Sequence, residues 1–206
     1  MDHSETIIAR LEGSLAAIGS LREQAGRIAD LASVLVEALR GGRTIYTAGN
    51  GGSAAQALHL SEELIGRYRG DRGPLRALCL NADPAALTCI ANDFGFEQVF
   101  ARQCAALLRR GDVLIVLSTS GNSPNLLEAL RVARHAGAVT VGLLGNGGGR
   151  CAGLCDHALS LEQRDSAWVQ EVHQVLIHLI CELIEREFSA ALAPAVSIST
   201  TRGTAR

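Results

Sequence analysis

The residues best suited to proton transfer begin with His59 and Glu63. These two side chains are four residues apart, so a helix would place them on one face. An imidazole beside a carboxylate can serve as an acid-base pair. The same spacing is also typical of an exposed helical ion pair, which contributes only about 0.2–0.5 kcal/mol. The spacing alone leaves both interpretations open.

A second polar cluster interrupts the last apolar helical segment of the chain. Its members are Gln170, Glu171, His173, Gln174 and His178. His178 is the most informative, because Leu176, Ile177, Leu179 and Ile180 surround it, and burying a histidine among apolar side chains is unfavourable unless a partner satisfies it. A functional histidine and a satisfied core histidine are both consistent with this pattern.

Two turns have the composition of an anion site. The sequence Gly49-Asn50-Gly51-Gly52-Ser53 follows one apolar run, and Ser118-Thr119-Ser120-Gly121-Asn122-Ser123 follows another; each precedes a helical segment. Helix N-termini at the carboxyl edge of a parallel sheet present free N–H groups to anions. The first turn could simply be a tight connection, but the hydroxyls of the second exceed what a turn needs and predict phosphate binding.

The basic residues exclude several kinds of chemistry. All 19 are arginine, so the chain contains no lysine. Schiff-base aldolases, pyridoxal-phosphate enzymes and P-loop nucleotidases all need a lysine amine. A phosphate site with an imidazole and a carboxylate but no lysine instead favours proton transfer next to the carbonyl of a sugar phosphate.

Composition predicts one globular domain over residues 1–190, followed by a flexible tail, 191–206. The chain has 206 residues, is 48% hydrophobic and carries a net charge of -2 with scattered arginines, which argues against nucleic-acid binding. No segment reads as a membrane span or a secretory signal, so we expect a cytoplasmic protein. The six cysteines lie mostly in apolar runs and are expected to be buried thiols.

Apolar periodicity predicts an α/β fold. Helical spacing over residues 5–40 predicts two helices, or one with a break, and residues 1–42 are expected to contribute to an oligomer. Five apolar runs then alternate with helical segments and predict a parallel sheet with helices on both faces: 44–49, 77–82, 112–119, 138–145 and 157–161. Helix starts are predicted at Ser53 with Gln56 as a capping box, at Asp83-Pro84 and at Ser123-Pro124, and the last helix is expected over 167–188.

Four segments together carry a resemblance to the sugar isomerase (SIS) domain family: GNGGSAAQALHLSEELIGRYR, ANDFGFEQVFARQ, GDVLIVLSTSGNSPNLLEAL and VQEVHQVLIHLI. The resemblance spans the chain to about Phe188. It implies a three-layer, flavodoxin-like sandwich with a five-stranded parallel sheet and an N-terminal helical extension. It also implies a homotetramer with active sites between subunits.

Within this family the chain resembles aldose-ketose isomerases that convert sedoheptulose 7-phosphate to D-glycero-D-manno-heptose 7-phosphate for heptose glycoconjugates. The resemblance assigns proton transfer through an enediol to Glu63, with His178 as its partner. It assigns substrate binding to Asn50, Gly51, Gly52, Ser53, Arg67, Asn92, Asp93, Ser118, Thr119, Ser120, Ser123 and Gln170.

The resemblance further implies one zinc ion per subunit, held by His59, Glu63, Gln170 and His178, and no organic cofactor. Some family members have an aspartate where this chain has Ala167, and Asp165 is the nearby candidate to replace it.

Two alternatives stay open at this level. One is a non-catalytic family member that binds the bacterial replication initiator; His178 argues against it, because that group lacks this histidine. The other is an isomerase of a different sugar phosphate, since phosphate turns recognise only the end that such substrates share.

Overall fold

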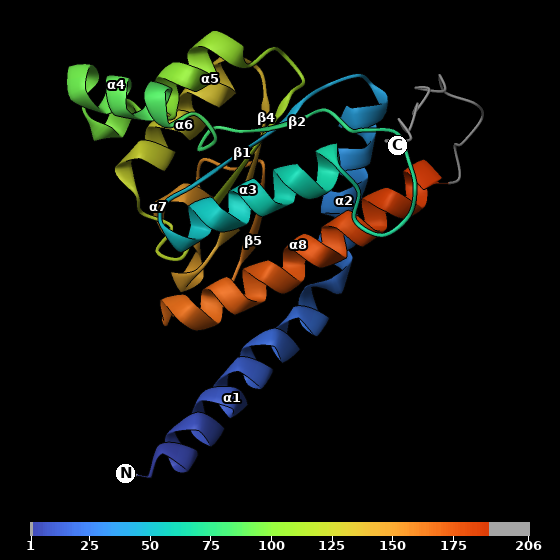
Figure 1. The fold of residues 1–206 in the computed structure, drawn as a ribbon, viewed down its shortest axis with the longest axis vertical. Coiled ribbons are helices and arrows are strands. Elements are labelled where there is room, and N and C mark those ends of the chain that lie inside the picture. The colour runs from blue at the N-terminus through green and yellow to red at the C-terminus, as the bar shows by residue number, and fades with distance from the viewer. Residues whose placement is uncertain (1, 190–206) are drawn as a thin grey trace, which may run out of the picture.

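Five parallel strands form the centre of the molecule (Figure 1). A computed structural model describes residues 2–189, and its sheet has the order β2-β1-β3-β4-β5. The strands are β1 (Ile45–Gly49), β2 (Ala77–Cys79), β3 (Val113–Ser118), β4 (Val139–Leu144) and β5 (His157–Ser160). All five predicted strands are present, which confirms the α/β fold. The predicted flexible tail, 191–206, lies outside the described residues.

The central strands are continuous apolar runs because both faces of the sheet are covered. Along β3, Val113, Ile115 and Leu117 point into one hydrophobic core. The alternate residues Leu114 and Val116 point into a second core on the opposite face. All five side chains are fully buried.

Helices form a layer on each face. The first core is shared by α2 (Ala25–Arg40), α3 (Gly52–Ile65) and α8 (Ser166–Ser189). The second is shared by α5 (Ala101–Leu107), α6 (Pro124–His135) and the short α7 (Gly149–Ala152). At the margin of the second layer, α4 (Pro84–Phe94) has no fully buried residue.

The N-terminal segment is helical with a break, as predicted. Helix α1 (His3–Gly19) is separated from α2 by a 3₁₀ turn, Ser20–Gln24. Helix α1 extends beyond the sandwich (Figure 1), and its residues Ile7, Ile8, Leu11 and Leu15 are all more than half exposed. Among residues 2–189, no helix is long and apolar enough to cross a membrane.

The predicted helix starts have mixed outcomes. Asp83 caps α4 by accepting hydrogen bonds from the N–H groups of Ala85 and Ala86, and Ser123 is the N-cap residue of α6. The capping box at Ser53 is wrong, because Gly51 is the N-cap of α3 and Ser53 lies inside the helix. Gly51 has φ 55°, a left-handed value that favours glycine, and this turn starts the helix earlier than the pattern predicts.

Candidate active site

The first glycine-rich turn joins β1 to α3 at the carboxyl edge of the sheet. Asn81 fixes its start, because its amide accepts from the N–H of Gly49 at 3.1 Å and donates to the Gly49 carbonyl at 3.0 Å. Ser53 is buried in the first turn of α3. No sequence pattern singled out Asn81. In the structure, its side chain makes the two hydrogen bonds with the Gly49 backbone that a residue of a neighbouring strand would otherwise make.

The hydroxyl-rich turn joins β3 to α6 at the same edge. Ser118 Oγ accepts from the N–H of Gly121 at 3.0 Å, and Ser120 Oγ accepts from the N–H of Asn122 at 3.2 Å. Gly121 has φ 64°, and a Cβ there would lie only 2.2 Å from the carbonyl oxygen of Gly148. The loop after β4 therefore supports this turn from behind and requires glycine at position 121.

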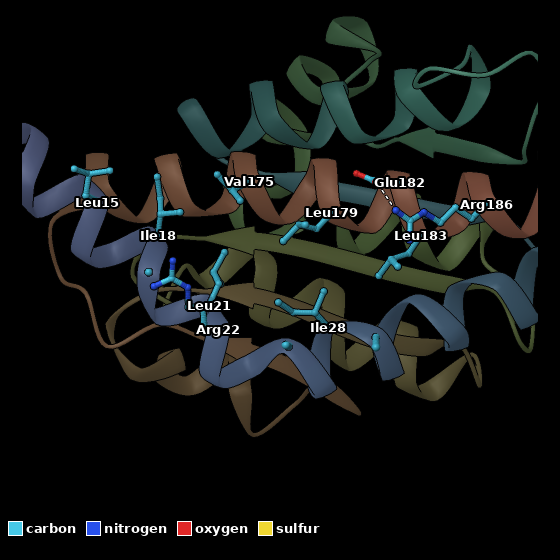
Figure 2. Close-up of a pocket in the computed structure, with 13 residues that line it drawn as sticks. Leu15, Ile18, Leu21, Arg22, Ile28, Val175, Leu179, Glu182, Leu183 and Arg186 are labelled. Carbon is cyan, nitrogen blue, oxygen red and sulfur yellow. Dashed lines mark hydrogen bonds and ion pairs between the residues drawn. The ribbon is translucent and has the colours of Figure 1, made fainter.

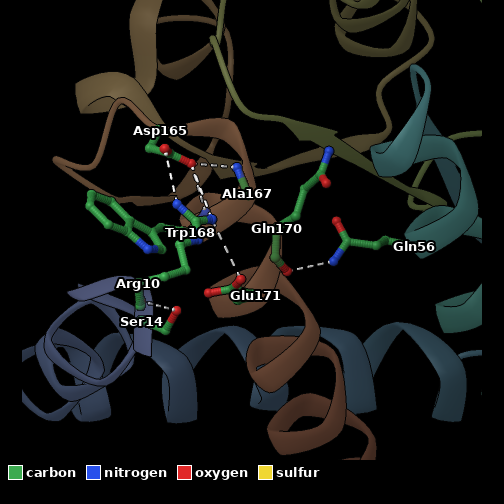
Figure 3. Close-up of polar contacts among 8 residues, drawn as sticks. All are labelled: Arg10, Ser14, Gln56, Asp165, Ala167, Trp168, Gln170 and Glu171. Carbon is green, nitrogen blue, oxygen red and sulfur yellow. Dashed lines mark hydrogen bonds and ion pairs between the residues drawn. The ribbon is translucent and has the colours of Figure 1, made fainter. Parts of the chain in front are cut away.

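Helices α3 and α8 lie side by side and start at the same edge of the sheet (Figure 1). At their starts, the Gln170 side chain covers Gly52, where an added Cβ would lie 2.5 Å from its amide nitrogen. Gln56 donates to the Gln170 carbonyl at 2.7 Å (Figure 3). Ser166, the first residue of α8, donates its hydroxyl to Thr119 at 3.3 Å. Both turns therefore adjoin the start of α8.

Further along these helices, the predicted acid-base residues meet. His59 Nε2 and Glu63 Oε1 are 3.0 Å apart. The Nε2 amide of Gln174 lies 2.9 Å from His59 Nδ1 and 3.0 Å from Nε2 of His178. The Glu63 and His59 side chains are 14% and 32% exposed, so the cluster is partly shielded yet open to a ligand. His178 is only partly buried and contacts the Gln174 amide, so it is not a core histidine enclosed by apolar side chains.

The same cluster has donors suited to a metal ion. His59, Glu63 and His178 each offer a ligand atom, and these atoms all lie within 4.8 Å of one another. Two imidazoles and one carboxylate form a typical catalytic zinc set, which leaves a position for water or substrate. The residues therefore fit zinc.

A second glutamine lies in this cluster, while Gln170 as a zinc ligand stays a prediction. Gln174 contacts both histidines, whereas the Gln170 side chain lies over Gly52, about one helical turn nearer the start of α8. The sequence contains Gln174 within the polar cluster, but no spacing rule separates it from Gln170. Among the described residues, Gln170 is brought to the glycine-rich turn, beside the expected phosphate site.

Asp165 is turned toward α1 (Figure 3). Its carboxylate accepts from Arg10 at 3.1 Å and from the N–H of Ala167 at 2.9 Å. The hydrogen bonds from Arg10 and Trp168 lower the pKa of Asp165, so it stays ionised. Asp165 therefore links the start of α8 to α1.

Three predicted substrate residues stand apart from the turns. Arg67 is exposed in the loop after α3, and Asn92 and Asp93 are exposed near the end of α4. The Asn92 amide donates to Asp93 at 2.7 Å. Among residues 2–189, no hydrogen bond or ion pair joins these three side chains to His59, Glu63 or His178.

Three other titratable groups of the interior stay uncharged because they are buried. Burial raises the pKa of Cys104 and Cys181 to about 12, so both thiols stay protonated, as expected of buried cysteines. Burial lowers the pKa of His173 to about 4, which keeps this fully buried ring neutral. The thiol of Cys89, in contrast, is exposed.

The fold and its turns are those of a sugar isomerase domain. The family model for the SIS domain matches residues 12–145, and the chain belongs to this family, as the sequence segments predicted.

Relatives of higher sequence identity show to which group within the SIS family the chain belongs. A phosphoheptose isomerase from Pelobacter propionicus is 46% identical over 169 residues, which cover 82% of this chain and 89% of that protein. The solved phosphoheptose isomerase from Neisseria gonorrhoeae is 35% identical with a TM-score of 0.85, covering 90% of this chain and all of that one. The structure from Francisella tularensis is 32% identical over the same shares, also with a TM-score of 0.85. Within the SIS family, the chain belongs to the phosphoheptose isomerases.

Proposed function

We propose that this protein is an aldose-ketose isomerase that converts sedoheptulose 7-phosphate to D-glycero-D-manno-heptose 7-phosphate for heptose glycoconjugates. The observation that carries the proposal is the meeting of Glu63 with His178 in a partly shielded cluster on the two helices that begin at the anion turns. The names of the relatives support the same activity. We expect this reaction to take place in the cytoplasm.

The phosphate is bound where the two turns face each other. Ser53 contributes from the first turn, and Ser118, Thr119, Ser120 and Ser123 contribute from the second. Gly51 and Gly52 carry no side chain that would block access to the N–H groups at the start of α3. Hydroxyls and backbone donors supply the hydrogen bonds that a lysine supplies in other phosphate sites.

The sugar extends from this phosphate site along α3 and α8. At about 1.5 Å per residue, His59 lies about 9 Å beyond Ser53 along the helix axis, and Glu63 about 15 Å. A sugar phosphate bound at the turns can therefore extend its reacting carbons toward the cluster. Gln170, over Gly52, lies where it would contact the phosphate end of the sugar.

Proton transfer is assigned to Glu63. Its Oε1 lies 3.0 Å from His59 Nε2, so with that oxygen given to His59 or to a bound metal, Oε2 would move the proton between carbon 1 and carbon 2 through the enediol. His178 lies beside the same carboxylate and exchanges protons with the sugar oxygens during ring opening and enolisation.

One zinc ion per subunit would be held by His59, Glu63 and His178, with Gln170 as the fourth ligand that the resemblance implies. The Gln174 amide lies beside the two histidines. Zinc at this place would polarise the sugar carbonyl and stabilise negative charge on its oxygen.

We expect the purified protein to bind about one zinc per chain. His59→Ala removes a zinc ligand. Loss of a residue that only supports a ligand weakens metal binding by about 10–100-fold, so loss of the ligand itself should weaken zinc binding by about 100-fold or more. Competition with a chromophoric chelator measures the affinity without any assay of activity. His135→Ala, which removes an exposed histidine at the end of α6, is the matched control and should bind zinc like the wild type. Unchanged zinc affinity in His59→Ala would place the metal elsewhere.

The subunits are proposed to form a homotetramer through α1. A groove of about 820 Å³ runs between α8 and the segment from α1 to α2, lined by Ile18, Leu21, Ile28, Val175 and Leu179 (Figure 2). The exposed apolar face of α1 has the length and character to fill such a groove on a second copy. Assembly would also let Asn92, Asp93 and Arg67 of a neighbouring subunit reach the active site, with which the same three residues of its own chain, as far as the structure describes it, form no hydrogen bond or ion pair.

We expect Leu11→Glu to dissociate this assembly, because it adds a charge to the apolar face of α1 without touching the chain's own core. Light scattering after size exclusion should show a smaller particle than the wild type, with helical content unchanged. Glu12→Gln, at the adjacent exposed position, is the control. A Leu11→Glu protein that keeps the wild-type mass would rule out the α1 interface.

The activity itself is tested with a panel of ketose phosphates. NMR of the products should show the heptose 7-phosphate formed from sedoheptulose 7-phosphate, and much slower conversion of fructose 6-phosphate and of unphosphorylated sedoheptulose. Preference for another sugar phosphate would keep the isomerase and change its substrate. A folded protein that binds the phosphates and converts none of them would refute the enzymatic proposal.

A further inference from the structure

Two asparagine side chains connect the anion turns. Asn50 lies in the first turn, after β1, and Asn125 is the second residue of α6, after the second turn. The Nδ2 of Asn50 donates to Oδ1 of Asn125 at 2.9 Å, and the Nδ2 of Asn125 donates to Oδ1 of Asn50 at 2.8 Å. Asn125 is 1% exposed. The two amides therefore form a closed, reciprocal pair.

The chemistry of this pair suits its position between two helix N-termini. The starts of α3 and α6 both carry partial positive charge, so they have no intrinsic attraction for each other. A neutral amide pair joins them with side-chain groups alone and leaves backbone N–H groups of both turns for a ligand. A carboxylate at either position could accept a hydrogen bond but could not donate one, and its charge would oppose a bound anion.

We propose that Asn50 and Asn125 are positioning residues that hold the two phosphate-binding turns at the separation a phosphate group needs. This inference rests on the proposed function, since it concerns the same anion site. It gives Asn50 a role through Asn125 instead of a direct contact with the sugar. Asn125, which no sequence pattern singled out, becomes as important for phosphate binding as Asn50.

A double-mutant cycle tests this proposal with inorganic phosphate as the probe. Asn50→Ala and Asn125→Ala should each weaken phosphate binding about tenfold, and the double variant should bind within about twofold of either single variant, because each single change already opens the pair. With the sugar phosphate, KM should rise more than kcat falls. Zinc affinity should stay at the wild-type value, because the metal cluster lies further along the helices.

Gln103→Ala is the matched control for a general loss of stability. Its amide donates to the carbonyls of Leu80 at 3.0 Å and Val99 at 2.8 Å, and neither residue belongs to the two turns. This variant should lower the melting temperature and leave phosphate affinity unchanged. If Asn125→Ala does not fold, Asn125→Asp keeps the shape but removes the donor, and it should also bind phosphate at least about tenfold more weakly.

Three results would overturn the proposal that the Asn50–Asn125 pair, the clamp, positions the turns. The first is wild-type phosphate affinity in a folded Asn125 variant. The second is a loss of phosphate affinity in Asn50→Ala that Asn125→Ala does not share, which would mean that Asn50 contacts the ligand directly. The third is additive losses in the double variant. Failure of the wild type itself to bind phosphate would instead refute the anion site of the proposed function and, with it, the clamp.

Discussion

Replacing Glu63 by glutamine should reduce kcat for the isomerisation by about 10³-fold, within the range that general acid-base catalysis contributes. Glutamine keeps the shape of the side chain and can still bond to His59, but it cannot accept a proton from carbon. KM should change little, because the phosphate turns lie nearer the start of α3. Steady-state kinetics on sedoheptulose 7-phosphate measure both constants.

The adjacent carboxylate provides the control for this experiment. Glu62 is exposed on the same helix, so Glu62→Gln makes the same chemical change outside the cluster and should leave kcat near the wild-type value. Zinc content is measured for each variant, so that a lost metal is not mistaken for a lost base. Near-normal turnover by zinc-loaded Glu63→Gln would remove Glu63 from the proton transfer.

The second large effect is expected at a buried ion pair behind the site. The side chains of Arg72 and Glu185 are 2% and 10% exposed, with 3.7 Å between Arg72 Nε and Glu185 Oε1. Arg72 donates to the carbonyls of Glu63 at 2.6 Å and Leu64 at 2.9 Å, at the end of α3. Glu185 accepts from backbone N–H groups of residues 68–70. The pair fixes both the helix end that carries Glu63 and the loop that follows it.

Glu185→Gln should lower the free energy of unfolding by about 3 kcal/mol, because it leaves the Arg72 charge buried without its partner. Urea unfolding at neutral pH measures the change. Glu187→Gln, in an exposed pair with Arg40, is the matched control and should change stability by less than about 1 kcal/mol. Equal effects in the two variants would show that the buried pair does not stabilise the fold.

The same pair predicts a pH dependence. Burial alone raises the pKa of Glu185, but the N–H groups of Gly70, Arg69 and Tyr68 and the charge of Arg72 together lower it. A lowered carboxyl pKa contributes stability that is present above the unfolded-state pKa and is lost as the pH falls through the folded-state pKa. The wild type should therefore lose more stability on acidification than Glu185→Gln does.

The strands and the pairing of His59 with Glu63 could be predicted because their signals are local. The runs at 112–119 and 138–145 are apolar on both faces, and the structure has β3 and β4 within one residue of those ends. His59 and Glu63 share a helix face by spacing alone. The start of α3 was misplaced because Gly51, with its positive φ, ends the turn before Ser53 can act as a cap.

The contacts that sequence analysis missed join distant parts of the chain. Gln174 meets His59 across 115 residues, and Asn125 meets Asn50 across 75. No periodicity or spacing rule relates such positions, so only the packing of α8 on α3, and of β1 beside β3, brings them together. Which glutamine contacts His59 depends on which turn of α8 faces it, and the pattern of the helix alone did not specify that Gln174 does.

Proton exchange at the sugar tests the central assignment most directly. Sedoheptulose 7-phosphate is incubated with the zinc-loaded protein in D₂O and followed by NMR, beside the His178→Ala and Glu63→Gln variants. An enediol mechanism at this cluster predicts that deuterium enters the sugar as the heptose 7-phosphate forms. Glu63→Gln should incorporate it about 10³-fold more slowly than the wild type, and His178→Ala should also be far slower than the wild type. Heptose phosphate formed without deuterium, or exchange at the wild-type rate in Glu63→Gln, would contradict it.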